Sequence, residues 1–492
     1  MITRSAAPRG HTVPLDLLIG GEWVTTEERF PVLNPATGET IAEPTSGGVD
    51  EALRALAAAH AAQESWSGWS PRARADLMHR AHRLLLERED AIVETMTLES
   101  GKPLAEARGE FALSASFFLW FAEQVAHLKG SYAEGSNGGY RVIVGHRPVG
   151  PSYLVTPWNF PLLMSARKAG AALGAGCTVV MKTARDTPLT QALFAEVLHD
   201  AGFPAGVVNL IHTRESGDVS RAIMADPRLR KVSFTGSTGV GATLLSQAAP
   251  GVVNSAMELG GDGPFIVLED ADIDLAVREA ILCKFRNAGQ ACVAANRIIL
   301  HEAIAEEFTQ KFVAAAAELR AGDGFDPDTT VGPLISARQR DRVVSLLERL
   351  VQLGGSVLLG GSPRAGDGFF FDPTVVQFTQ ERHALSNEEL FAPVAALYTV
   401  DSAAAALRLA NDTPYGLAAY LFTRDISRAI TLGERLEFGM VGLNRGIMAD
   451  PAAPFGGTKT SGVGREAGHD GIYEFLEPHY MALSVDTEGA VA

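Results

Sequence analysis

Strands and helices alternate along almost the whole chain of 492 residues, and this pattern limits the fold more than any other feature. In the second half the apolar runs RIIL, SVLLGG, PVAALYTV and AAYLF alternate with the helical segments EAIAEEFTQKFVAAAAEL, SAAAALRLAN and ISRAITLGERL. Such alternation is typical of α/β proteins with parallel sheets. Because one hydrophobic core does not serve a chain of this length, the sequence predicts two or three α/β domains.

One amphipathic surface helix can be bounded from its own residues. Ser70 precedes Pro71, and Leu77, Ala81 and Leu85 follow at helical spacing in SPRARADLMHRAHRLLLERED. Serine is a good N-cap and proline suits the first turn, so this segment predicts a helix that begins at residue 71.

The segment that starts at Lys129 breaks the alternation. KGSYAEGSNGGYRVIVGHRPVGPSYLV has a glycine-rich turn and a β-branched run with no helix directly after it. This pattern predicts a β-hairpin that protrudes as an arm and can add its edge to another subunit.

Charge and cysteine content exclude several classes of partner. Asp and Glu total 58 against 42 Lys and Arg, a net charge of −16, so we expect neither nucleic acid nor an anionic membrane as partner. The amino terminus lacks the apolar core of a signal peptide, and the longest weakly polar run is too short for a bilayer, so we expect a cytoplasmic protein. Cys177, Cys283 and Cys292 form no C-x-x-C pair, which predicts no disulfide framework and no metal site.

Polar residues occur where predicted strands pass into loops, which is where open α/β sheets bind ligands. TPWNFP follows the strand SYLV and presents Asn159 on a turn stiffened by prolines, where an amide can donate to an oxyanion. TGSTGVG follows KVSF and predicts a phosphate-binding site at a helix N-terminus. MELGGDGPF and SNEELFAPV place Glu258 and Glu389 beside two further turns.

The stretch FRNAGQACVAANR sets Cys292 among small and polar residues. The order TPWNFP, SFTGSTGVG, ELGG, FRNAGQACVAANR, EELFAPV and PFGGTKTSGVGRE resembles the aldehyde dehydrogenase superfamily, and the resemblance runs from Ile19 almost to the end of the chain. It implies an α/β fold with two open parallel domains and a β-hairpin oligomerisation arm. It also implies oxidation of an aldehyde to a carboxylic acid by a nicotinamide cofactor, through a cysteine thioester.

The resemblance implies roles for single residues as well. Cys292 matches the nucleophile, Asn159 the oxyanion donor, and Glu258 the base that activates the deacylating water. The residues that match cofactor-binding positions are Thr156, Pro157, Trp158, Lys182, Arg185, Gly236, Ser237, Glu389 and Phe391.

The same resemblance divides the chain. Residues 1–128 and 149–257 are expected to form the cofactor-binding domain, and residues 258–446 the catalytic domain. Residues 129–148 and 470–492 are expected to form the arm and a carboxy-terminal strand. We expect these two segments to pair across subunits, which gives a homodimer or a homotetramer.

The segment MKTARDTPLT bears on the choice of cofactor. Family members that prefer NAD commonly have a glutamate that binds the adenosine ribose, where this chain has Arg185. A guanidinium can pair with a 2′-phosphate, whereas a carboxylate repels it. We therefore expect NADP, and NAD is the alternative if Arg185 makes only a surface ion pair.

The substrate is indicated by a narrower resemblance. SARKAG, KFRNAGQACVAANR and the segment from GLNRG to YEFLE look most like succinate-semialdehyde dehydrogenases. In that branch the arginines that match Arg167 and Arg286 bind the distal carboxylate of the substrate. The alternative is that both arginines pair with buried carboxylates of the protein. The stretch MADP around Asp450 stands where that branch has a serine-bearing loop that helps line the pocket. Another small aliphatic or aromatic aldehyde is therefore the second candidate substrate.

Other functions stay open. A non-catalytic nucleotide-binding homologue needs none of Cys292, Glu258 and Asn159, yet the chain has all three. A coenzyme-A-acylating dehydrogenase needs no hydrolytic base, so Glu258 favours a free acid as product. A cysteine protease is disfavoured because no histidine lies within the Cys292 motif. Ala392 and Asp262 depart from the family pattern and bring the geometry of their loops into question.

Overall fold

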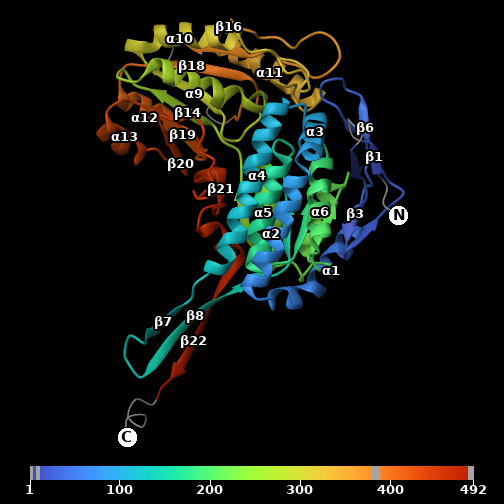
Figure 1. Ribbon diagram of the computed structural model, residues 1–492. Coiled ribbons are helices and arrows are strands. Elements are labelled where there is room, and N and C mark those ends of the chain that lie inside the picture. The colour runs from blue at the N-terminus through green and yellow to red at the C-terminus, as the bar shows by residue number, and fades with distance from the viewer. Residues whose placement is uncertain (1–3, 7–10, 379–387, 486–492) are drawn as a thin grey trace.

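The structure is a computed structural model that describes residues 4–6, 11–378 and 388–485, and it consists of two large sheets covered by helices and a long arm (Figure 1). Small parts of the domains predicted for residues 1–128, 258–446 and 470–492 therefore lie outside the described residues. The helices are α1 Val49–Ser67, α2 Pro71–Glu87, α3 Glu89–Ser100, α4 Leu104–Gln124, α5 Pro161–Ala175, α6 Leu189–Ala201, α7 Ser216–Ala225, α8 Thr238–Ala248, α9 Ile273–Phe285, α10 Glu302–Ala317, α11 Ala337–Gln352, α12 Ala403–Asn411 and α13 Ile426–Gly433.

The first sheet has a parallel centre and antiparallel edges. Its strands β9 to β12 are buried along their whole length, as expected for parallel strands with helices on both faces. After β9 the chain adds β10 and β11 on one side and β12 on the other, so a topological switch point lies between β9 and β12. In spatial order the strands are β21 Gly462–Val463, β13 Asn254–Glu258, β12 Lys231–Thr235, β9 Ser152–Val155, β10 Val179–Lys182, β11 Val208–Ile211, β3 Leu17–Ile19 and β4 Glu22–Val24.

The second sheet is parallel except for its edge strand β16. Its strands carry the apolar runs that the sequence showed, and their side chains join one core with helices such as α10 and α11. In spatial order the strands are β16 Ser356–Leu359, β17 Thr374–Phe378, β18 Val394–Val400, β15 Ala295–His301, β14 Gly263–Val267, β19 Ala418–Phe422 and β20 Met440–Leu443. The predicted α/β fold class with two parallel sheets is confirmed.

Helices α5 and α6 pack against the first sheet, and α2 and α4 pack on these two helices (Figure 1). Helix α5 is buried on every side, and it packs closely on α4 because its contact residues are small. A Cβ at Gly170 would lie 3.1 Å from the ring of Phe121 on α4. The predicted helix at residue 71 is confirmed as α2, where the Ser70 side chain accepts a hydrogen bond from the Ala73 N–H.

The arm extends away from both sheets (Figure 1). It contains the predicted hairpin, β7 Ser131–Glu134 and β8 Tyr140–Pro148, and the carboxy-terminal strand β22 Leu476–Ser484. Our expectation that the arm and this strand pair across subunits was wrong, because β22 pairs with β8 of the same chain over their whole length. The pairing covers one edge of each strand and leaves β22 and β7 at the edges of the three-stranded sheet. Two further pairs are small, β1 Arg4–Ala6 with β2 Thr12–Pro14, and β5 Val32–Leu33 with β6 Thr40–Ala42.

Candidate active site

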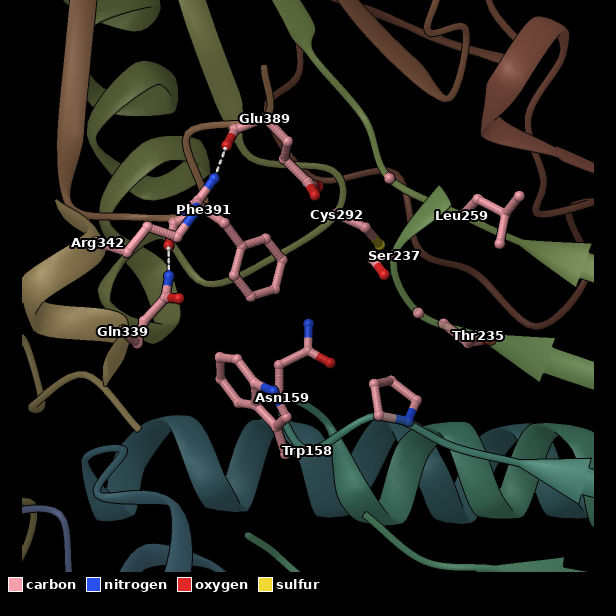
Figure 2. A pocket seen from close by; sticks show the side chains of 13 residues that line it. Trp158, Asn159, Thr235, Ser237, Leu259, Cys292, Gln339, Arg342, Glu389 and Phe391 are labelled. Atoms are coloured by element: carbon pink, nitrogen blue, oxygen red, sulfur yellow. Dashed lines mark hydrogen bonds between the residues drawn. The ribbon is translucent and has the colours of Figure 1, made fainter. Parts of the chain in front are cut away.

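Stretches that are far apart in the sequence meet in a cavity of about 270 Å³, which we call the first cavity (Figure 2). Three of them follow β9, β12 and β13 of the first sheet, and the others come from the loops before β15 and β18 and from α11. The first three converge because parallel strands end at one edge of their sheet. The lining residues are Pro157, Trp158, Asn159, Thr235, Gly236, Ser237, Leu259, Gly260, Cys292, Gln339, Arg342, Glu389 and Phe391.

Cys292 is half-buried and lies in the loop between α9 and β15. The loop is held in an unusual conformation, with Asn287 and Ala288 at a φ of 54° and Gly289 in contact with the backbone of Ala392. Burial raises the pKa of the Cys292 thiol to about 12, and the nearby Glu389 carboxylate adds to the shift. The thiol is therefore protonated at neutral pH in the protein alone, and its activation needs a base or a change in its surroundings.

Asn159 projects into the first cavity from the turn after β9 (Figure 2). Its side-chain Nδ2 donates to the carbonyl of Gln290 at 3.0 Å, two residues before Cys292. Its Oδ1 is buried and has no hydrogen-bond partner among the described residues. We call the loop between α9 and β15 the nucleophile loop, after the predicted role of Cys292. The amide thus lies beside the backbone of this loop, as the predicted oxyanion role requires.

Glu389 and Phe391 are fixed by a helix that our sequence analysis did not identify. From α11, Arg342 donates to the backbone carbonyl of Glu389 at 2.6 Å, and Gln339 donates to that of Phe391 at 2.8 Å (Figure 2). The Glu389 side chain accepts a hydrogen bond from the Gly261 N–H at 3.1 Å, while burial raises its pKa to about 7. The amphipathic pattern of ARQRDRVVSLLERLVQ is the signal that could have found this helix.

Aromatic rings form one wall of the first cavity. The rings of Trp158 and Phe391 meet edge to face with centroids 5.5 Å apart. The turn of Gly236 and Ser237 forms the opposite wall, directly before α8. A flat apolar ring system could enter between these walls.

The remaining predicted cofactor residues lie at the same sheet edge but outside the lining of the first cavity. Thr156 donates to the Gln191 side chain at 2.8 Å, and the buried Lys182 donates to the Thr183 carbonyl at 3.0 Å. Burial lowers the pKa of Lys182 to about 8. Arg185 is exposed, and its guanidinium makes no hydrogen bond or ion pair within the described part of the chain.

Glu258, the predicted base, ends β13 and is buried. It lines neither the first cavity nor the second, described below, and its carboxyl lies against Gly456, where a Cβ would be 2.7 Å from Oε1. Burial raises its pKa well above the usual range, and the negative charge of Glu466 adds to this effect against the opposing charges of Arg167 and Lys168. These surroundings favour the neutral form of the Glu258 carboxyl.

A second cavity of about 350 Å³ adjoins Cys292 from the side of α4 and α5. Cys292 lines both cavities, so the thiol lies where they meet. Most of the second lining is apolar, with a few charged side chains from α4, α5 and the nucleophile loop. Its residues are Lys102, Ala105, Glu106, Gly109, Glu110, Leu113, Phe160, Leu163, Met164, Arg167, Leu282, Arg286, Cys292, Val293, Ile447, Ala449 and Phe455.

The two predicted substrate arginines both line the second cavity, but they differ in their partners. Arg167 is almost fully buried, and its Nε lies 2.5 Å from Oε2 of Glu466. Arg286 lies over the ring of Phe160 at 5.6 Å, and among the described residues its guanidinium has no hydrogen bond and no ion pair. Arg167 is thus paired with a protein carboxylate, which it shares with Lys168, whereas Arg286 makes no ion pair among the described residues.

The three departures from the family pattern have local explanations. The Asp450 carboxylate accepts a hydrogen bond from the Ala452 N–H at 2.9 Å and lies outside the lining of both cavities. Asp262 pairs with the buried Arg297 at 2.9 Å. Ala392 is completely buried beside the nucleophile loop. None of these residues places an unpaired charge in a cavity.

Comparison with known proteins assigns the family. The sequence model of the aldehyde dehydrogenase family matches residues 23–481. This chain belongs to the aldehyde dehydrogenase family. The predictions of the family and of an aldehyde dehydrogenase as enzyme class are therefore confirmed.

This aldehyde dehydrogenase has relatives that match it over nearly their whole length. It is 47% identical over 445 residues to a succinate-semialdehyde dehydrogenase of Paenarthrobacter nicotinovorans, covering 90% of this chain and 98% of the relative. It is 42% identical over 470 residues to the succinate-semialdehyde dehydrogenase [NADP(+)] of Escherichia coli, covering 95% and 97%. The crystal structure of succinate-semialdehyde dehydrogenase from Burkholderia pseudomallei superposes with a TM-score of 0.94 at 41% identity, covering 96% of this chain and 98% of that one. Within its described residues, this aldehyde dehydrogenase has no helix with the length and apolar character needed to cross a membrane.

Proposed function

We propose that this aldehyde dehydrogenase oxidises succinate semialdehyde to succinate with NADP as the preferred cofactor. The observation that carries the proposal is the position of Cys292 between the two cavities. One cavity has aromatic and glycine walls suited to a nicotinamide, and the other holds Arg286, whose guanidinium makes no ion pair among the described residues. The names of the relatives support the same substrate and cofactor.

The residues of the first cavity fit a nicotinamide cofactor. Thr235 Oγ1 is buried beside the cavity and has no hydrogen-bond partner among the described residues, which leaves a polar atom for a ligand. Glu389 and Phe391 would hold the nicotinamide riboside, and Gly236 and Ser237 the pyrophosphate. The exposed Arg185 would pair with the 2′-phosphate. When bound, NADP would accept the hydride from the aldehyde carbon.

The chemistry of the chain itself uses the residues around the junction. Cys292 loses its proton to water, and its sulfur then attacks the carbonyl carbon of the aldehyde, which forms a thiohemiacetal oxyanion. The Asn159 amide and the Cys292 backbone N–H stabilise this negative charge. After loss of hydride the carbon is a thioester, and Glu258 takes a proton from the water that hydrolyses it. For this step the Glu258 carboxylate must move towards the thioester, since it lies outside both cavities in the structure.

The second cavity would hold the tail of the substrate. Arg286 would bind the carboxylate, and its guanidinium lies over the Phe160 ring, 5.6 Å from the centroid. The apolar remainder of the lining would cover the two methylene groups between the carboxylate and the aldehyde. Arg167 would contribute less, because it already pairs with Glu466.

The test is steady-state kinetics with NADP and with NAD on succinate semialdehyde, glutarate semialdehyde, butyraldehyde and benzaldehyde. We expect the highest kcat/KM for succinate semialdehyde with NADP. Equal specificity constants for butyraldehyde and the two semialdehydes would contradict the proposal and favour a dehydrogenase for neutral aldehydes. Absence of NADPH and NADH formation with all four aldehydes would favour a non-catalytic homologue.

We further propose that the protein forms a homodimer or homotetramer through the arm. The described part of β22 is at a sheet edge, and Tyr480 and Leu483 on it are exposed, which is the kind of edge that pairs with another chain. Light scattering should show an oligomer, and Tyr480→Lys with Leu483→Lys should shift it towards monomer. Leu353→Lys, on an exposed position outside the arm, is the control. A wild-type protein that is monomeric would contradict the proposal.

A further inference from the structure

Lys102 and Glu110 form a buried ion pair in the wall of the second cavity. The side chains of both residues are 1% exposed, and Nζ lies 2.5 Å from Oε2. Burying two charges costs free energy that their mutual attraction repays only when further hydrogen bonds satisfy both groups. The partners of the pair therefore indicate what it does.

The Lys102 ammonium binds the turn that carries the proposed oxyanion donor. Its Nζ donates to the backbone carbonyl of Asn159 at 2.7 Å. The side chain of Asn287, from the nucleophile loop, donates to the same carbonyl at 3.0 Å. The position of the Asn159 backbone is thus fixed from two sides, and one of them is Lys102.

The Glu110 carboxylate binds the next residues of the same segment. Its Oε1 accepts hydrogen bonds from the N–H groups of Leu162 at 3.0 Å and Leu163 at 3.2 Å, in the first turn of α5. These groups have no partner within the helix, and the residue before α5, Phe160, provides no side-chain cap. A carboxylate is also favourable at the positive end of a helix. Glu110 therefore caps α5 from a neighbouring helix and fixes where it begins.

We propose that Lys102 and Glu110 are positioning residues for Asn159, which hold its amide beside Cys292 during formation of the oxyanion. The inference rests on the proposed role of Asn159 in the reaction. Together the pair anchors both ends of the short segment from Asn159 to Leu163, so the amide cannot move away from the nucleophile loop. Alignment of this kind matters because a displacement of about 1 Å can cost about 100-fold in rate.

Two substitutions separate the Lys102–Glu110 ion pair from the capping of α5 by Glu110. Glu110→Gln keeps an oxygen that can accept from the first turn of α5 but removes the charge opposite Lys102. Lys102→Met removes the donor to the Asn159 carbonyl. In each variant we expect the first-turnover rate of NADPH formation to fall by about 10- to 100-fold, with KM values for NADP and aldehyde changed by less than about threefold. Lys102→Arg, which keeps a cation and a donor, should recover most of the rate.

Alkylation of Cys292 by iodoacetamide provides a readout that does not depend on turnover. Alkylation forms no oxyanion, so its rate should be unchanged in Lys102→Met and Glu110→Gln. Lys231→Met is the matched control, since Lys231 is also buried and bonded, to Asn254 at 2.6 Å, but lies at the opposite end of β12 from the first cavity. It should leave the first-turnover rate unchanged.

The outcomes distinguish this inference from the proposed function. Asn159→Ala should lower the first-turnover rate by about 100- to 1000-fold, and a normal rate there would contradict its oxyanion role. If Lys102 acts through Asn159, Lys102→Met should cause no further loss in the Asn159→Ala background. Additive losses, unchanged rates in both pair variants, or alkylation that slows in parallel with oxidation would overturn the inference while leaving the role of Asn159 intact. If Lys102→Met or Glu110→Gln does not fold, a Lys102→Arg variant as slow as Asn159→Ala would overturn it as well.

Discussion

The two cavities that meet at Cys292 are built in different ways. The first is formed mainly by turns that follow strands of the first sheet, such as those of Asn159 and Gly236. The second is formed mainly by side chains on the facing surfaces of helices α4 and α5. The cofactor side of the site is therefore a property of the sheet edge, whereas the substrate side is a property of a helix interface.

This difference suggests which parts of the site can vary independently. A sheet edge presents backbone groups and short side chains, which suit a ligand that many enzymes share. A helix surface can change single side chains without altering the sheet, which suits the choice of substrate. Substitutions can test whether the two cavities behave as separate units. A substitution of Cys292 should affect both cavities, because this residue lines each of them.

Cys292→Ser should have the largest effect, because the thiol belongs to both cavities. We expect turnover to fall by more than about 1000-fold with every aldehyde and with either cofactor, since a serine alkoxide is far harder to form than a thiolate. NADP binding, measured by fluorescence or calorimetry, should be unchanged. Near-normal turnover in this variant would exclude the thioester mechanism.

The same contrast explains how much of the molecule could be predicted from the sequence. The alternation of strands and helices, the cap at Ser70 and the glycine-rich hairpin depend on local spacing, so the fold class, α2 and the arm were found. The residues that follow strands of the first sheet, such as Asn159 and Gly236, converge because parallel strands end at one edge. Their exact environment could not be predicted, and Glu258 proved to lie outside both cavities.

Residues that act across helix interfaces escaped the sequence analysis. Glu106 and Glu110 are four residues apart on one face of α4, and Lys102 lies just before that helix, but charged residues at this spacing usually indicate a solvent-exposed face. Only the packing of α4 on α5 shows that these residues line a cavity. Similarly, nothing local indicates that Arg167 meets Glu466, which is 299 positions further along the chain. The pairing of β22 with its own arm likewise depends on tertiary structure.

Glu258→Ala should affect both substrate types equally, because the base acts on the thioester and on neither cavity alone. We expect steady-state turnover to fall by about 100- to 1000-fold, as for loss of a general base. Stopped-flow absorbance should still show a burst of NADPH, since acylation does not need this carboxylate. Loss of the burst together with turnover would place Glu258 at an earlier step.

Arg286→Ala should affect only the second cavity. We expect kcat/KM for succinate semialdehyde to fall by about 100-fold, which is the loss of a charge-assisted pair, while butyraldehyde changes little. Arg167→Ala is the comparison, and its loss should be less selective because it also leaves Glu466 without its guanidinium partner. Equal losses on acidic and neutral aldehydes in Arg286→Ala would show that Arg286 only supports the loop.

Arg185→Glu should affect only the cofactor side. We expect the ratio of kcat/KM for NADP to that for NAD to fall by about 10-fold or more, because the exposed pair with the 2′-phosphate is replaced by repulsion. The ratio of succinate semialdehyde to butyraldehyde should stay the same. A wild type that strongly prefers NAD would contradict the proposed cofactor, and a changed aldehyde ratio would show that the cavities are coupled.

The smallest expected effect concerns the charge of the second cavity. Glu106 lines this cavity and accepts a hydrogen bond from the Asn287 N–H at 2.8 Å. Burial raises its pKa to about 7, while Lys102 and Arg286 lower it and Glu110 raises it further.

A carboxyl with a raised pKa is neutral below that pH and negative above it, so a rise from pH 6 to pH 8.5 adds a negative charge beside the substrate carboxylate. KM for succinate semialdehyde should therefore rise about threefold relative to KM for butyraldehyde over this range. The ratio of the two KM values removes every pH effect that the two substrates share. Glu106→Gln should make the ratio independent of pH, and a ratio that still rises in this variant would assign the effect to another group.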